Sequence, residues 1–109
     1  MKYFRAQRVS SLIRDELNKL LLRYVEIPEA LTTITDVAVS KDLDRAVVKF
    51  SVLPSEKAER VLKILNKARG NLQYRLLRKI NIKPMPQIAF EIDYGPTKAA
   101  SIEKALMNE

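Results

Sequence analysis

Residues 45–53, Arg-Ala-Val-Val-Lys-Phe-Ser-Val-Leu, decide the fold of this chain. Their side chains alternate between an apolar set and a more polar set, which is the period of a half-buried β-strand. The apolar set is Ala46, Val48, Phe50 and Val52, and the other set is Arg45, Val47, Lys49 and Ser51. Residues 33–40 are rich in Thr and Val, and the Asp-rich segment 41–44 is typical of a hairpin connection. We therefore expect an antiparallel sheet that is covered on one face only.

A helix is predicted on either side of this hairpin, because apolar residues recur there at spacings of three and four. Residues 6–24 carry Val9, Leu12, Ile13, Leu17, Leu20, Leu21 and Tyr24, and Pro28 ends the segment. Residues 55–80 carry Ala58, Val61, Leu62, Leu65, Ala68, Leu72, Leu76 and Ile80. An unbroken helix over 55–80 would be about 39 Å long, more than the diameter of about 34 Å expected for such a domain. We therefore predict two helices, joined at Ala68-Arg69-Gly70, where Gly70 invites a break.

The C-terminal part predicts a third strand at residues 87–94, after Pro84 and Pro86. Gly95-Pro96 is a turn signal, and Thr97 is expected to cap a short C-terminal helix. The chain shows no repeat, linker or low-complexity segment. Residues 1–109 are thus predicted to form a single α+β domain, with a three-stranded sheet packed by helices on one face.

The composition excludes several classes of function. The 109 residues are 47% hydrophobic and 30% charged, as expected for a folded domain, and they include neither Cys nor His. A thiol nucleophile, a thiolate zinc site and a histidine general base are therefore excluded, so we expect no catalysis, no cofactor and no metal. Asp42 and Asp44 are interpreted as turn residues rather than as metal ligands. Without a signal peptide or a long apolar run, we expect a cytoplasmic protein with no membrane partner.

The charge indicates a polyanionic partner. Lys and Arg number 20 against 13 Asp and Glu, which gives a net charge of +7. Between Glu59 and Glu91 there are eight basic residues and no acid. Arg60 and Lys63 are expected to pair with Glu56 and Glu59, four residues earlier. The others lack a local partner and repel one another, which favours binding to a phosphate backbone.

A second basic group at the N-terminus contains Arg5 and Arg8. Lys19 and Arg23 are interpreted as ordinary surface, because Asp15 can pair with Lys19. Gly70 has two compatible interpretations: it kinks the helix to fit a small domain, and it exposes backbone amides to nucleic acid. Tyr74 is interpreted as core edge, so base stacking is not predicted. The candidate RNA-binding residues are Arg5, Arg8, Lys67, Arg69, Gly70, Arg75, Arg78, Lys79 and Lys83.

Four segments, in this order, resemble the ribosome-binding factor A family along nearly the whole chain: Arg5 to Val9, Thr35 to Ser51, Ala68-Arg69-Gly70, and Pro86 to Asp93. The resemblance implies a single KH-like type II domain, αββααβ. A usual KH domain clamps RNA with a Gly-x-x-Gly loop, whereas this chain contains only Gly70 and Gly95. Gln73 stands where the family tends to carry Arg, which leaves the role of this position open.

The resemblance also implies a function. The protein is expected to act in late maturation of the small (30S) ribosomal subunit, by binding 16S rRNA or its precursor on free immature subunits. It would aid processing and folding of that RNA, chiefly in the cold, as a monomer and without a small-molecule substrate. The residues alone leave two alternatives open: a general RNA-binding module without ribosome specificity, and a module whose basic face binds an acidic protein.

Overall fold

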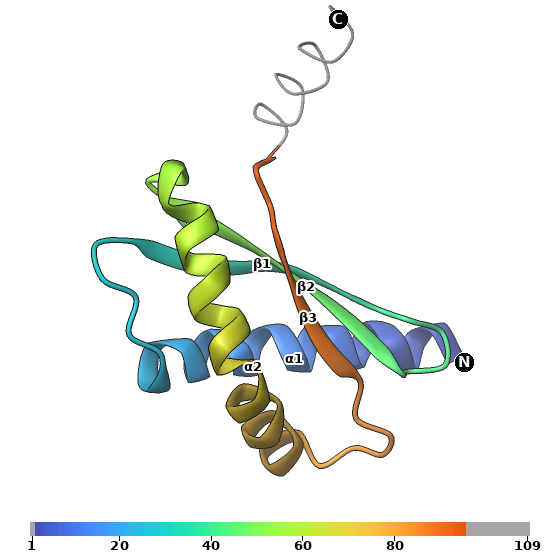
Figure 1. The fold of residues 1–109 in the computed structure, drawn as a ribbon. Helices are drawn as coiled ribbons and strands as arrows, with labels where there is room; N and C mark the ends of the chain where they lie inside the picture. The colour runs from blue at the N-terminus through green and yellow to red at the C-terminus, as the bar shows by residue number, and fades with distance from the viewer. Residues whose placement is uncertain (1, 96–109) are drawn as a thin grey trace, which may run out of the picture.

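The computed structural model of the chain describes residues 2–95, except for the side chains of residues 2–5. Within these residues, two long helices, three strands and one short turn of 3₁₀ helix follow one another (Figure 1). They are α1 (Lys2–Tyr24), β1 (Leu31–Val39), β2 (Arg45–Leu53), η1 (Ser55–Lys57), α2 (Ala58–Ile80) and β3 (Gln87–Ile92). The predicted α+β class is confirmed, and the strand read from residues 45–53 has the expected bounds. The predicted short C-terminal helix at Thr97 lies outside the described residues.

The sheet has the strand order β1-β2-β3, with β2 in the centre. β1 and β2 form the predicted antiparallel hairpin, in a register that runs from Leu31 opposite Leu53 to Val39 opposite Ala46. β3 instead lies parallel to β2, with Gln87 beside Arg45. The sheet is therefore mixed, and the expectation of an entirely antiparallel sheet was wrong. The reason is that α2 carries the chain back to the end of the sheet where β2 begins, as a parallel crossover requires.

The hairpin loop is closed by one serine side chain. Ser40 Oγ accepts hydrogen bonds from the backbone N–H groups of Asp44 and Arg45, both at 3.1 Å, and donates one to Asp44 Oδ1 at 2.6 Å. The bond from Ser40 is the main reason why the pKa of Asp44 lies below its ordinary value. Asp44 is thus a turn residue, as the sequence predicted.

One hydrophobic core lies between the sheet and the two helices. From Ala6 onward, α1 contributes five buried residues, namely Val9, Ile13, Leu17, Leu20 and Leu21. Leu12 and Tyr24, which the sequence placed on the same stripe, are 44% and 47% exposed, so that part of the prediction was wrong. The middle of β2 carries Phe50, which is fully buried and meets Phe90 of β3 edge to face, with 6.3 Å between ring centroids.

α2 is a single uninterrupted helix, so the predicted break at Ala68-Arg69-Gly70 is wrong. Gly costs about 1 kcal/mol relative to Ala inside a helix, whereas burial of one Leu contributes about 1.5–3 kcal/mol. Leu65 on one side of Gly70 and Leu72 and Leu76 on the other are all buried, and they hold both halves against the core. An unbroken helix fits because the domain is flattened, with extents of 46 × 34 × 18 Å, rather than spherical.

The ends of α2 also differ from the prediction. Residues 55–57 form the separate 3₁₀ turn, and α2 begins at Ala58. At the other end Asn81 adopts the left-handed conformation, with φ 54°, and its N–H donates to the carbonyl of Leu77 at 3.0 Å. β3 ends at Ile92, two residues before the predicted end. Within the described residues no helix is long and apolar enough to cross a membrane. The KH-like type stays a prediction.

Candidate nucleic-acid interface

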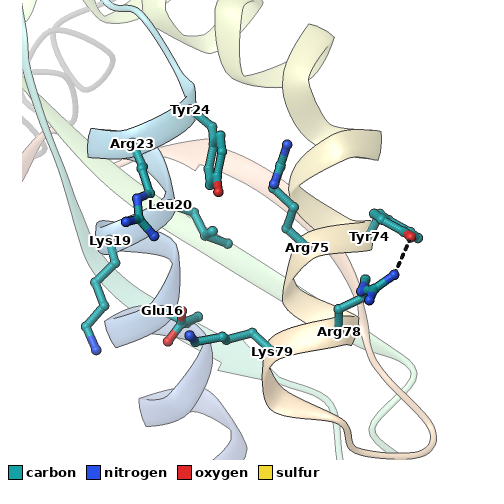
Figure 2. A pocket seen from close by; sticks show the side chains of 9 residues that line it. All are labelled: Glu16, Lys19, Leu20, Arg23, Tyr24, Tyr74, Arg75, Arg78 and Lys79. Carbon is teal, nitrogen blue, oxygen red and sulfur yellow. Dashed lines mark hydrogen bonds between the residues drawn. The ribbon is translucent and has the colours of Figure 1, made fainter.

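A groove of about 440 Å³ separates the C-terminal half of α1 from the C-terminal half of α2. Figure 2 shows its lining, which consists of five cations, one acid, two tyrosines and one leucine. These residues are Glu16, Lys19, Leu20, Arg23 and Tyr24 of α1, and Tyr74, Arg75, Arg78 and Lys79 of α2. We call this feature the α1–α2 groove. Its excess of positive charge is what a phosphate-binding surface requires.

Arg75 connects the two walls of the groove. Its guanidinium carbon lies 3.6 Å from the centroid of the Tyr24 ring, so the cation rests on an aromatic face of the other helix. Its Nε donates a hydrogen bond of 2.8 Å to Asn71 Oδ1, one turn earlier on α2. Such a cation–π contact contributes about 0.5–1 kcal/mol at an exposed site. The two contacts together fix the plane and the position of the guanidinium group.

Arg78 is held in a similar way within α2. Its Nη1 donates a hydrogen bond of 2.9 Å to the hydroxyl of Tyr74, and its guanidinium carbon lies 5.7 Å from the centroid of that ring. This hydrogen bond raises the pKa of Arg78 above its already high ordinary value, so the side chain carries its charge throughout the physiological range. Tyr74 is 56% exposed, and the interpretation of Tyr74 as core edge was wrong.

Lys19 and Arg23 were missed as candidate residues. They were assigned to ordinary surface because Asp15 was expected to pair with Lys19, but Asp15 instead lies 3.7 Å from Arg14. The packing of α1 against α2 brings Lys19 and Arg23 to the groove that Arg75, Arg78 and Lys79 also line. Their spacing of four residues, next to the buried Leu20, was the available signal. It becomes informative only when the neighbouring helix is known.

Lys67 and Arg69 do not act as one group around a bend. Two residues apart on a continuous helix, they point in directions that differ by about 160°. Lys67 precedes Arg78 by eleven residues, which places the two within about 20° of each other on one face. Lys67 therefore extends the basic surface of the groove along α2, whereas Arg69 lies on another side. Gly70 exposes no helix N-terminus, because the helix continues through it.

The remaining predicted residues are spread along the chain. Arg8 is exposed on α1, eleven residues before Lys19 and thus on nearly the same side of that helix. Lys83 is exposed in the connection between α2 and β3. The side chain of Arg5 lies outside the described part of the structure. Whether these residues bind RNA stays a prediction.

The expected ion pairs of Glu56 with Arg60 and of Glu59 with Lys63 are not formed within the described part of the chain. Arg60 Nη2 instead donates to the carbonyl of Pro28, and Glu59 Oε1 accepts a hydrogen bond of 3.3 Å from the hydroxyl of Tyr94. Lys63 is consequently a further exposed cation on α2. The basic face of this helix is therefore larger than the sequence predicted.

Gln73 has a structural role that the sequence left open. Its Nε2 donates a hydrogen bond of 2.8 Å to the carbonyl of Pro86, and its Oε1 accepts one of 2.8 Å from the N–H of Ile88. The single side chain thus fastens the start of β3 to α2. Among residues 2–95, no group of three or more His, Cys, Asp or Glu residues is placed to hold a metal ion.

Comparison with known proteins identifies the family. The family model of ribosome-binding factor A matches residues 5–106. The chain belongs to the ribosome-binding factor A family. The ribosome-binding factor A of Pseudomonas fluorescens is 34% identical over 99% of this chain and 87% of its own length. That of Thermodesulfovibrio yellowstonii is 33% identical over 95% of this chain and 89% of its own. The resemblance read from the sequence is confirmed.

Solved structures agree on the fold. The crystal structure of ribosome-binding factor A from Thermus thermophilus has a TM-score of 0.61 at 24% identity, over 84% of this chain and 96% of that one. A homology model of the Thermus thermophilus factor, fitted into a cryo-EM map of its complex with 30S, has a TM-score of 0.59 at 22% identity. It covers 80% of this chain and 89% of that one. The family takes its name from binding to ribosomes and not from a catalysed reaction.

Proposed function

We propose that this protein binds the small ribosomal subunit through its 16S rRNA and acts, without catalysis, in late maturation of that subunit in the cytoplasm. Membership of the ribosome-binding factor A family supports the proposal, as does the 30S complex of the Thermus thermophilus factor. The observation that carries it is the α1–α2 groove, where five cations face one acid.

The proposed mechanism is a shift between RNA conformations. Lys and Arg side chains of the groove bind phosphates, and the protein favours whichever rRNA conformer presents phosphates at the matching positions. A factor that binds one conformer more tightly than another shifts their populations by that difference, tenfold for each 1.4 kcal/mol or so. The effect is largest in the cold, where misfolded rRNA rearranges slowly. A monomer that binds free immature subunits suffices for this role.

Sedimentation of cell lysate containing the tagged protein tests the proposal. Sucrose-gradient fractions at low and moderate salt are probed for the protein on free small subunits, large subunits and complete ribosomes. We expect enrichment on free small subunits. An even distribution over all RNA-containing fractions that disappears with salt would indicate a general RNA-binding module instead. Association that survives nuclease treatment would indicate an acidic protein partner.

A matched pair of variants connects the result to the groove. Arg23→Gln with Lys79→Gln removes two charges from the groove, and Lys41→Gln with Arg45→Gln removes two exposed charges from the hairpin between β1 and β2. Both double variants lower the net charge equally. We expect subunit association to weaken in the groove variant and to change little in the hairpin variant. Equal weakening in both would contradict the assignment of the groove.

A further inference from the structure

We infer that the α1–α2 groove holds one unpaired nucleotide of an RNA strand, with its base stacked against the Tyr24–Arg75 pair. This inference rests on the proposed function and deepens it, because it names the form of RNA that the groove recognises. A surface that binds only phosphate backbone treats paired and unpaired RNA alike. A groove that stacks a base prefers a nucleotide that is free of its partner.

The shape and the lining of the groove fit a base. Its volume of about 440 Å³ falls within the usual range of small-ligand sites, which begins near 300 Å³. Leu20 is 8% exposed and contributes an apolar surface, whereas the rings of Tyr24 and Tyr74 are about half exposed. Besides holding Arg75 and Arg78, both tyrosines remain about half exposed, and binding of phosphate alone does not use this exposed aromatic surface. Aromatic rings and guanidinium planes are the surfaces on which unpaired bases stack.

The stacking surface is already in place. The guanidinium group of Arg75 stacks on Tyr24 and also donates a hydrogen bond to Asn71. Its orientation is therefore already fixed before a base binds. A group that is held in its bound position loses little conformational entropy on binding, which favours affinity. Figure 2 shows the Tyr24 ring and the Arg75 side chain next to each other, between the two helices.

The charges in the groove separate the place of the base from that of the phosphate. Lys19, Arg23 and Lys79 have no ion pair within the described part of the chain and are available to a phosphate. Glu16 is the single acid of the lining, and it repels a phosphate while its carboxylate accepts hydrogen bonds from the N–H groups of a base. By helical geometry Lys67 lies on the same side of α2 as Arg78, about 16 Å away along the helix axis, which is farther than one nucleotide reaches. This spacing favours an RNA strand over a free nucleotide.

Binding of two RNA hairpins to the full chain tests the inference. The hairpins are identical except that one contains an unpaired nucleotide in its stem, and affinity is measured by fluorescence anisotropy. We expect the bulged hairpin to bind at least about fivefold more tightly, the lower end of the effect of stacking on one base. Equal affinity of the wild-type protein for both hairpins would overturn the inference.

Three sets of variants locate the preference. Tyr24→Leu with Tyr74→Leu keeps every charge and removes both rings, and we expect the bulged hairpin to lose more affinity than the paired hairpin, so that the preference disappears. Tyr24→Phe with Tyr74→Phe keeps the rings and is expected to keep the preference. Arg75→Lys keeps the positive charge but removes the planar guanidinium group, and it takes the place of the leucine variant in this test if that variant does not fold. A leucine or lysine variant that folds and retains the full preference would overturn the inference.

Two further measurements distinguish the other outcomes. The chain contains no Trp, so its intrinsic emission comes from Tyr, and a stacked base is expected to quench it. A free nucleoside monophosphate that displaces the bulged hairpin at micromolar concentration would assign the groove to a free nucleotide and overturn the RNA assignment. Sedimentation with small subunits is scored separately. If the wild-type protein fails to bind subunits, the proposed function fails whatever the hairpins show.

Discussion

The bridge from Gln73 to the start of β3 gives the sharpest test of the fold, by the substitution Gln73→Met. Methionine matches the length of glutamine but neither donates nor accepts a strong hydrogen bond. It therefore leaves the N–H of Ile88 and the carbonyl of Pro86 without the partners that each has at 2.8 Å. Ile88 is 1% exposed and Pro86 is fully buried, so water replaces these partners poorly.

The expected cost follows from these two groups. A buried polar group left without a partner costs about 1–3 kcal/mol, and the thioether regains part of this by apolar contact. We expect a loss of about 2 kcal/mol in the free energy of unfolding. For a domain of this size this lowers the melting temperature by roughly 8–16 °C. Urea unfolding followed by circular dichroism measures the free energy, and calorimetry measures the melting temperature.

Gln87→Met is the matched control, because it makes the same chemical change at an exposed residue at the beginning of β3. Its effect should stay within about 0.5 kcal/mol, as is usual for surface substitutions. Gln73→Glu adds a second comparison, since its protonated form regains the donor and its penalty should shrink as the pH falls. If Gln73→Met and Gln87→Met unfold within 0.5 kcal/mol of each other, the bridge does not stabilise β3 and the reasoning is refuted.

Three further predictions concern the continuity of α2 at Gly70, the basic face of α2, and the stability of the fold at acidic pH. Gly70→Ala should stabilise the protein by about 0.5–1 kcal/mol in thermal unfolding. The helix is continuous, and apart from the neighbouring residues and backbone of the helix itself no atom lies within 4 Å of the new methyl position. A loss of stability would contradict the continuous helix. Lys67→Glu should weaken sedimentation with small subunits more than Arg69→Glu, because only Lys67 lies on the face of the groove; the reverse order would contradict this placement. Hydrogen bonds from the hydroxyl of Thr35, and then from the N–H of Gly95, hold the pKa of Asp93 below its ordinary value of 3.8. The ionised Asp93 therefore stabilises the folded state above pH 3.8, and this contribution is lost as the pH falls through the lowered pKa. Thr35→Val should raise the pKa of Asp93 in an NMR titration and lessen this acid dependence, and an unchanged titration would contradict the role of Thr35.

The parts of the fold that the sequence predicted well depend on local patterns. The alternation in residues 45–53 defined β2 to the residue, because one face of that strand is buried along its whole length. The hairpin loop followed from the turn preference of Asp44, which its hydrogen bonds to Ser40 explain. The parallel pairing of β3 with β2 could not be read in this way. It joins residues about 40 positions apart through α2, and no local pattern encodes that contact.

The candidate site was predicted only in part for a similar reason. Arg75, Arg78 and Lys79 were found from the charge of a single segment, but their neighbours Lys19 and Arg23 come from the other helix. The rule for pairs four residues apart also assigned Lys19 to Asp15, which in the folded chain lies beside Arg14. The break at Gly70 was inferred from glycine preference and an assumed spherical shape. Burial of leucines on both sides of Gly70 outweighs that preference.

The central position of β2 has a consequence for synthesis of the chain. One neighbour of β2 is made before it, but the other, β3, is complete only at residue 92, about 40 residues after β2 ends. At about 5–20 residues per second, β2 leaves its second edge without a hydrogen-bonding partner for roughly 2–8 s. Unpaired edges of this kind are where nascent chains associate wrongly. The lysine and arginine of β2, together with the net charge of the chain, keep copies on neighbouring ribosomes apart during that interval.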